Sequence, residues 1–383
     1  MGYAAARGGL EAILAAEDLV RRKRTEGSSA PLEVDQITDR LRLSVDRVMG
    51  EAGLWAPELA ARALRQAEGD LVEAAHLLRA YRSTRRRLAR PVTVDADELE
   101  ILRRIVPAYR VPEGPQLLGR TLDYVGRLLD TSDRVSTGVE EATHAGTEPQ
   151  VLVFGGETDR RPERLLEQLR RNDLALDRRR SDDPEPYDIN VHPVRPGVPR
   201  SARLSVMARA ETGALVNLWY RNVLGPDGYI REITLGEVRH GWLPVRVEHP
   251  ATGQPVNLGR IRVTETEAIE DLDGDDEARD HFDVGYGMCV GHNERKAIAM
   301  ANLDIAVHRD GGRSSLEQSV LMTTDGLESS GFLEHLKLPH YVTFRSMVER
   351  KMSLRAVASG ERNDDRAAAI EDEEIRTEAV VGA

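Results

Sequence analysis

The chain has 383 residues, of which 40% are hydrophobic and 31% are charged, a balance typical of a globular protein with a substantial core. The formal net charge of −12 argues against general affinity for nucleic acid, and one cysteine, Cys289, excludes an internal disulfide and an iron–sulfur cluster held by cysteines of this chain alone. No uncharged run is long enough to span a bilayer and the N-terminal residues lack a secretory pattern, so we expect a soluble, cytoplasmic protein with no membrane partner.

The first part of the chain has the apolar spacing of helices. That spacing recurs over residues 10–24 and 35–49, and Pro57 and Asp70 are well placed to begin two more helices. We therefore expect a helical domain at residues 1–130. Its last predicted helix runs into a basic segment, residues 82–90 (RSTRRRLAR). Charge runs are usually solvated surface, but arginines also bind carboxylates or phosphates, so this segment is the stronger candidate for an interaction surface.

The middle and end of the chain change in character. Residues 131–200 are irregular apart from a helical stretch near 161–172, and we expect a loop-rich linker with a short helix. Strand-like segments separated by turn signals then follow at residues 203–209, 214–223, 229–239, 242–248 and 256–267.

These segments predict an antiparallel meander or barrel-like sheet. With helices at about 293–308 and 345–357, they would form a domain at residues 201–357. The acidic residues 358–383 are expected to be a disordered tail. The fold class is therefore α+β, with an N-terminal helical bundle, a central antiparallel sheet, and C-terminal helices that carry an irregular histidine-bearing loop.

Two histidines, His335 and His340, flank a short apolar segment in FLEHLKLPHY. Five positions apart, they cannot share a helical face as an i,i+4 pair does, and Pro339 pushes Leu338 into an extended conformation. Both rings could therefore converge on one point and bind a metal, leaving coordination positions for water, substrate or a partner. The alternative is that both are ordinary surface or half-buried histidines.

The segment at 285–301, GYGMCVGHNERKAIAMA, has three glycines before a helix that Asn293 can cap. Arg295 and Lys296 lie in the first turn, where backbone N–H groups and cations make a plausible anion site. These two residues are our candidates for substrate binding, although glycines can equally serve to lead the chain into a buried helix. The general acid is not assigned, because helix capping and solvation explain the neighbouring carboxylates Glu294 and Glu334 equally well.

Several stretches, taken in order, resemble the phosphonate-metabolism protein I family (PhnI), a subunit of the bacterial carbon–phosphorus lyase core complex. These stretches are LRLSVDRVMGEAGL (41–54), ELAARALRQAEGDLVEAAHLLRAYRST (58–84), GPQLLGRTLDYVGRLLD (114–130), GEVRHGWLPV (236–245), GYGMCVGHNERKAIAMA (285–301) and SGFLEHLKLPHYVTF (330–344). The match is weakest over residues 131–200 and after about 358.

The resemblance implies a function. The family's complex displaces adenine from ATP with an alkylphosphonate and forms ribose 1-alkylphosphonate 5-triphosphate. The I subunit alone is associated with purine nucleosidase activity. Arg295 and Lys296 would then hold the triphosphate of ATP, and His335 and His340 match the family's zinc site, near the contact with the radical-SAM J subunit.

The expected partners are the G, H and J subunits and a second copy of the chain, since the core contains two; the ABC-type K and L subunits are further candidates. Two other hypotheses stay open. One is a non-catalytic scaffold that supplies a zinc site to its partners, and the other is a stand-alone nucleotide glycohydrolase.

Overall fold

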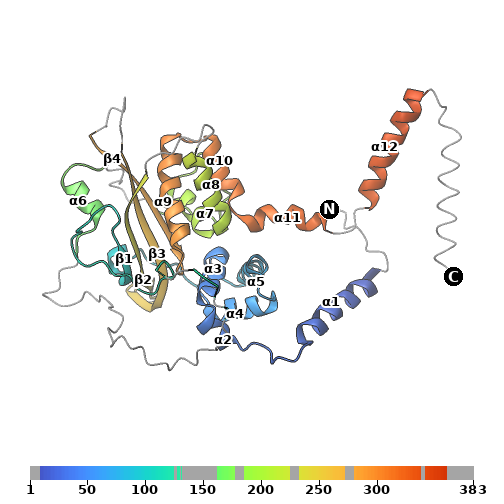
Figure 1. Ribbon diagram of the computed structural model, residues 1–383, viewed down its shortest axis with the longest axis horizontal. Helices are drawn as coiled ribbons and strands as arrows, with labels where there is room; N and C mark the ends of the chain where they lie inside the picture. The colour runs from blue at the N-terminus through green and yellow to red at the C-terminus, as the bar shows by residue number, and fades with distance from the viewer. Residues whose placement is uncertain are drawn as a thin grey trace. The chain divides into compact units, whose positions relative to one another are not determined.

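The computed structural model describes residues 9–124, 127–129, 131, 162–176, 185–224, 233–271, 280–337 and 341–359. It divides into two units, Ala30–Ser329 and a second that combines Met1–Ser29 with Ser330–Ala383 (Figure 1). The larger unit contains a small helical bundle and a sheet with helices on both faces. None of the described helices combines the length and the apolar character needed to cross a membrane.

The bundle follows the predicted helices closely. Its elements are α2 (Val34–Arg40), α3 (Arg42–Ala52), α4 (Pro57–Gln66) and α5 (Leu71–Ser83). Pro57 lies in the first turn of α4, and the Asp70 carboxylate accepts a hydrogen bond from the Glu73 N–H at 2.8 Å, both as predicted. The helix expected over 35–49 is instead two helices, because the backbone of Leu41 leaves the helical region at φ −108° and ψ 35°. The buried core of the bundle includes Ile37, Val45, Val48, Met49, Leu64 and Leu78.

The sheet has four antiparallel strands in the order β1 (Glu100–Ile105), β2 (Ile233–Glu248), β3 (Pro255–Asp271) and β4 (Phe282–Val290). Strand β1 lies within the range expected to be helical and pairs with β2. The sheet is open, so the described residues do not form the barrel-like closure that we considered.

Two of the expected strands are helices, and two others are one strand. Residues 203–209 and 214–223 belong to α7 (Arg200–Arg209) and α8 (Thr212–Leu224), so their assignment as strands was wrong. Their buried side chains recur at helical spacing, as at Val206, Met207 and Ala210. Strand β2 runs unbroken through Gly241, where an added Cβ would lie 2.0 Å from the Glu100 carbonyl oxygen. That glycine allows β1 to approach β2, and it does not end a strand.

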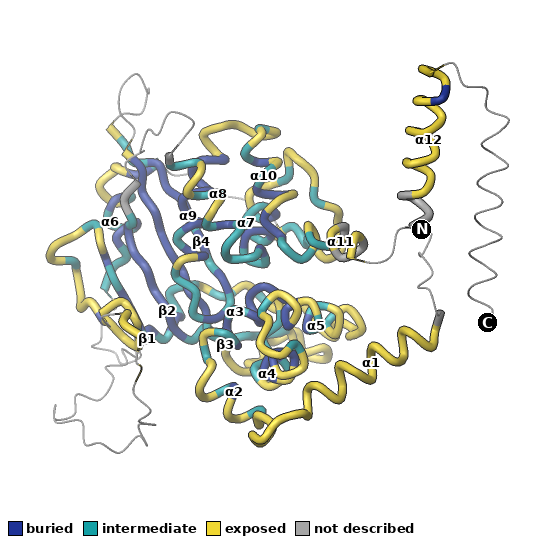
Figure 2. The backbone as a smooth tube through the Cα atoms, turned by 45° about the vertical axis from the view of Figure 1, so that its right-hand side comes forward, coloured by how far each residue is buried: buried dark blue, intermediate teal, exposed yellow. Residues whose placement is uncertain are grey.

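Helices cover both faces of the sheet. On one face, α9 (Glu294–Arg309) packs on β3 and β4 through Ala268 and Ile305, and α7, α8 and α10 (Ser315–Thr323) pack around α9 (Figure 1). On the other face, Ile269 contacts α6 (Leu165–Arg171). Successive strand residues point to opposite faces, which is why Ala268 and Ile269 reach different helices. In Figure 2 the strands and α9 are largely buried.

The smaller unit contains α1 (Gly9–Thr25) and α12 (Tyr341–Ser359), which correspond to the first and last predicted helices. Helix α11 (Gly326–Leu336) begins in the larger unit and ends in this one. The side chains of α1 are exposed along the helix, with Leu10 at 68% (Figure 2).

Replacing Gly285 by alanine is expected to destabilise the protein by about 1–3 kcal/mol, the usual effect of overpacking a core. Gly285 lies in β4, and an added Cβ would lie 1.9 Å from the Ala301 carbonyl oxygen of α9, so helix and sheet would have to separate. The free energy of unfolding in urea measures this. Gly312→Ala is the matched control, because that position is open. Equal stability of the two variants would contradict the close packing described.

Candidate functional site

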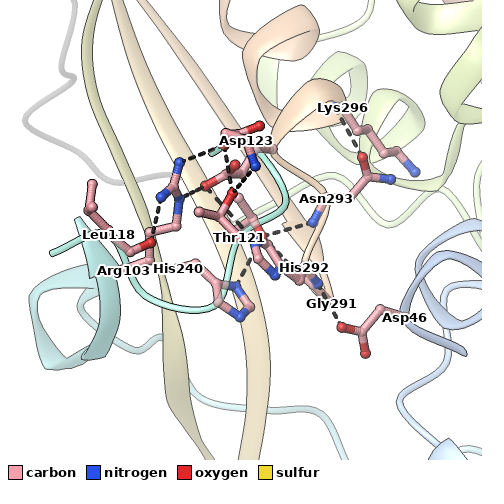
Figure 3. A network of polar contacts seen from close by, with 12 residues as sticks. Asp46, Arg103, Leu118, Thr121, Asp123, His240, Gly291, His292, Asn293 and Lys296 are labelled. Atoms are coloured by element: carbon pink, nitrogen blue, oxygen red, sulfur yellow. Dashed lines mark hydrogen bonds and ion pairs between the residues drawn. The ribbon is translucent and has the colours of Figure 1, made fainter. Parts of the chain in front are cut away.

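The candidate site lies where β4 ends and α9 begins. Gly291 turns the chain at φ +83°, and its N–H donates to the Arg262 carbonyl oxygen at 2.8 Å. Asn293 caps α9 as predicted, since its side-chain oxygen accepts from the Lys296 N–H at 3.2 Å. The turn and the cap fix the position of His292, which lies between Gly291 and Asn293 (Figure 3). Glu294 follows the cap as the first residue of α9.

The His292 ring stacks on the His240 ring of β2, with centroids 4.1 Å apart and planes 15° apart (Figure 3). His240 Nδ1 lies 2.9 Å from the Val263 carbonyl oxygen. A carbonyl oxygen can only accept, so Nδ1 carries the proton and Nε2 is left as an acceptor. Burial, followed by the nearby His292, lowers the pKa of His240 to about 2. His240 is therefore neutral at physiological pH.

An ionised carboxylate lies near the Nε2 atom of the His292 ring. Glu294 Oε1 lies 3.8 Å from His292 Nε2, and Arg103 Nε of β1 donates a hydrogen bond to the same carboxylate. Burial alone would raise the pKa of Glu294, but the interactions with His292 and Arg103 outweigh it and lower this pKa. Arg103 is itself held by the Leu118 carbonyl oxygen and by Asp123 Oδ2 at 3.1 Å (Figure 3).

Guanidinium groups outnumber the carboxylates on the bundle side of the site. Arg42 Nη1 lies 3.2 Å from His292 Nδ1, and Asp46 binds both the His292 N–H at 3.1 Å and Arg262 Nη2 at 2.6 Å. Burial lowers the pKa of Arg42; Asp46 opposes this shift, while the charges of Arg120 and Arg262 add to it. Asp46 is the carboxylate that contacts both Arg42 and Arg262, so the cluster retains positive charge that an anion could neutralise.

The structure does not bring Arg295 and Lys296 together. Arg295 is exposed, whereas Lys296 is 1% exposed and its Nζ has no hydrogen-bond partner within the described residues. Neighbouring helix residues point in different directions, and burial lowers the pKa of the Lys296 amine. Gly285 and Gly287 lie in β4 against α9, so the packing interpretation of the glycine segment is the one that the structure supports.

Replacing Lys296 by methionine is expected to raise the free energy of unfolding by about 1–3 kcal/mol, since a buried polar group without a partner is destabilising. Chemical denaturation measures the stability. If the same variant also keeps full activity in the complex, the prediction that Lys296 binds substrate is wrong. A loss of stability would instead mean that the amine has a partner.

The predicted zinc ligands lie at the limit of what the structure describes. His335 belongs to the last turn of α11, but its side chain and that of Glu334 are not described, and His340 lies outside the described residues. Across the described part of the chain, no group of three or more metal-ligating side chains comes together. Cys289 is buried, and burial raises the pKa of its thiol to about 11, in agreement with an inert thiol.

Sequence reasoning missed the residues that converge on the site. Arg42 and Asp46 come from α3, Arg103 from β1, and His240 from β2. A signal was present, because the stretches 41–54, 236–245 and 285–301 each carry members of this cluster. Their convergence depends on strand pairing and helix packing, which spacing along the chain does not encode.

His240 makes stability fall at acidic pH. Its ordinary pKa is 6.5 and its folded value is about 2, so below pH 6.5 the unfolded state takes up a proton that the folded state does not. Between pH 7 and pH 5 this should remove about 2 kcal/mol of stability. His240→Asn retains a donor for the Val263 carbonyl oxygen and cannot be protonated. The variant should therefore lose less stability than the wild type between pH 7 and pH 5. Identical pH dependence of unfolding in the variant and the wild type would contradict a neutral buried His240.

The site therefore combines a half-buried carboxylate with two guanidinium groups that share one aspartate. Residues 2–358 match the sequence model of the family described as bacterial phosphonate metabolism protein (PhnI), and the chain belongs to this family.

The chain is similar to three characterised or named relatives. It is 40% identical over 371 residues to HtxH of Stutzerimonas stutzeri, which is provisionally assigned as a C-P lyase subunit protein; the match covers 91% of this chain and 95% of HtxH. The other two are named alpha-D-ribose 1-methylphosphonate 5-triphosphate synthase subunit PhnI. The one from Escherichia coli (strain K12) is 38% identical, with 91% of this chain and 96% of the relative covered. The one from Rhizobium meliloti (strain 1021) is 36% identical, with 92% of this chain and 95% of the relative covered.

Proposed function

We propose that this chain is a subunit of the carbon–phosphorus lyase core complex and that it takes part in displacing adenine from ATP with an alkylphosphonate, giving ribose 1-alkylphosphonate 5-triphosphate. The family and the names of two relatives support the class of reaction. The observation that carries the assignment to this chain is the ionised Glu294, which lies between His292 and Arg103, while Arg42 contacts the other ring nitrogen of His292 and Arg262 contacts Asp46.

The reaction needs that combination of charges. The C1′–N9 bond of ATP breaks with its electron pair going to the adenine, and a phosphonate oxygen forms the new bond to C1′. The ribose passes through a cationic, oxocarbenium-like state, which a fixed carboxylate such as Glu294 can stabilise. Guanidinium groups at Arg42 and Arg262 can orient an anionic phosphonate or phosphate group. His292 acts on Glu294 by positioning it.

Purine nucleosidase activity of the isolated chain follows from the same groups. Water would take the place of the phosphonate, and the products would be free base and ribose triphosphate. The carboxylate and the arginines would have the same roles.

We also propose the zinc site at His335 and His340. Two neutral imidazoles are a donor set that suits zinc and leaves positions for other ligands. The bound ion would act as a Lewis acid toward a phosphonate or phosphate oxygen. The proposed partners are the G, H and J subunits and a second copy of this chain, with J beside the zinc.

The second candidate function is a scaffold that supplies surfaces and the zinc site to catalytic partners. The exposed apolar residues of α1 favour the scaffold function, since Leu10 is 68% exposed and Leu19 is 49% exposed. Exposed apolar side chains on one helix are typical of a surface that binds another protein. Under this hypothesis the reacting groups would belong to other subunits.

Zinc content and adenine release from ATP, measured together, separate these functions. The preparations are the wild type, His335→Ala/His340→Ala and Glu294→Gln, each alone and in the complex. We expect the double variant to lose zinc and Glu294→Gln to lose adenine release while it keeps zinc. Full adenine release by Glu294→Gln in the complex would overturn catalysis at this site and favour the scaffold.

A further inference from the structure

A cavity of about 780 Å³ contains none of the charged or imidazole side chains of the His240–His292 site in its lining. Its lining includes Ile261 and Val263 of β3, which alternate with Arg262 and Thr264 of the candidate site. Alternate residues of a strand point to opposite faces, so at β3 the two places lie on opposite sides of the sheet, while residues of α7 and α9 such as Ala208 and Met300 complete the cavity lining. The volume falls within the range of sites that enclose small organic ligands.

The cavity lining combines a group of apolar residues, here called its apolar side, with a group of arginines, here called its cationic side. The apolar side is formed by Leu204, Ala208, Leu243, Ile261, Val263, Met288 and Val290. The cationic side is formed by Arg82, Arg87, Arg90 and Arg209, against two carboxylates, Glu185 and Asp188. Three of these arginines come from the basic segment at residues 82–90. No residue of that segment has a role in the proposed reaction.

Among the described residues, Arg82 is hydrogen-bonded to carbonyl and amide oxygens and to no carboxylate. Arg82 donates to the Ala52 and Gly53 carbonyl oxygens at 3.1 and 2.9 Å and to Asn190 Oδ1 at 2.6 Å. Glycine is favoured at position 53, because the backbone there is left-handed at φ +66°. Burial lowers the pKa of Arg82, and the charges of Arg209, Arg79 and Arg87 lower it further.

The carboxylates near Arg82 are already engaged. Asp188 Oδ2 accepts from Arg87 at 2.5 Å, and Glu185 lies 3.7 Å from Arg90. The hydrogen bond from Arg87 holds the pKa of Asp188 well below its usual range. Arg87 is paired with Asp188 and Arg209 with Asp325 and Glu328, so Arg82 is the guanidinium whose charge an incoming anion could neutralise.

We propose that this cavity binds a nucleoside polyphosphate, at a site separate from Glu294. The base and ribose would lie against the apolar side, with Tyr187 in the lining as an aromatic surface. The phosphates would lie against Arg82, Arg87 and Arg90. A free phosphate would leave the apolar side unused, whereas a nucleotide matches both sides and the volume.

The test is equilibrium binding of adenosine 5′-(β,γ-imido)triphosphate to the full chain. Arg87→Ala/Arg90→Ala is expected to weaken binding at least about tenfold, the loss typical of charge-assisted contacts. Ser205→Trp, which places an indole in the cavity, is expected to remove this binding and to leave only the binding that the Glu294 site contributes. The matched control, Arg62→Ala, removes an exposed arginine of α4 and should bind as the wild type does. Inorganic triphosphate is expected to bind more weakly than the analogue and to lose affinity in the same variants.

Analogue binding that is unchanged in both cavity variants would overturn the proposal, as would no binding to the wild type. Inorganic triphosphate binding as tightly as the analogue would also overturn it, because the apolar side would then contribute nothing. Circular dichroism of the Ser205→Trp variant checks its fold. The proposed reaction is judged separately by adenine release from Glu294→Gln, so either proposal can fail without the other.

Discussion

Glu294→Gln is expected to reduce adenine release from ATP by the assembled complex about 10²–10³-fold, the usual effect of removing one electrostatic stabiliser from an active site. The substitution keeps the shape of the side chain and removes its charge. Arg103 and His292 would then face a neutral amide, and the cationic ribose would lose its counter-charge. The rate of adenine release with saturating methylphosphonate measures the effect.

Two controls distinguish lost chemistry from lost structure. Glu58→Gln changes an exposed carboxylate of α4 and should release adenine at the wild-type rate. Size-exclusion chromatography should show that Glu294→Gln assembles normally. A rate within about threefold of wild type in an assembled complex would exclude Glu294 as the stabilising group.

Glu237→Ala is expected to lower the free energy of unfolding by about 3–5 kcal/mol, the range found when one partner of a buried ion pair is removed. Glu237 and Arg104 are each 2% exposed, and Arg104 Nε lies 2.7 Å from Glu237 Oε1. The second oxygen accepts from the Leu165 N–H at 3.2 Å, at the start of α6. The variant would leave a buried guanidinium without its counter-ion.

The double variant Arg104→Met/Glu237→Met tests that explanation. It removes both charges and fills the volume, so it should recover most of the stability that Glu237→Ala loses. Urea unfolding of the wild type and both variants measures this. If the double variant is as unstable as Glu237→Ala, lost side-chain packing would account for the lower stability, and the unpaired charge of Arg104 would not.

Much of the helical part of the fold could be predicted because its signals are local. Asp70 and Asn293 act as caps through their own side chains, and Pro57 fits a first helical turn without any tertiary contact. Helices α7 and α8 were missed because short apolar segments of this length suit a strand or a buried helix equally. The break between α2 and α3 at Leu41 could not be predicted, because the sequence has no capping residue or proline there.

The site was harder to predict because it depends on distant segments. His240 and His292 stack only because β2 pairs with β3 and β4 ends beside β3 in the observed register. Arg42 and Arg103 come from α3 and β1, and no spacing rule connects either with His292. Lys296 was predicted to bind substrate from its place at a helix start, but the face of α9 that packs inward decides its burial.

The most direct test of the central claim is a structure of the assembled complex with bound adenosine 5′-(β,γ-imido)triphosphate and methylphosphonate. We predict that C1′ of one nucleotide contacts the Glu294 carboxylate and that the phosphonate contacts the Arg42 and Arg262 guanidiniums. A complex in which every bound ribose is held by residues of partner subunits, away from Glu294, would contradict the claim that this chain carries the displacement of adenine.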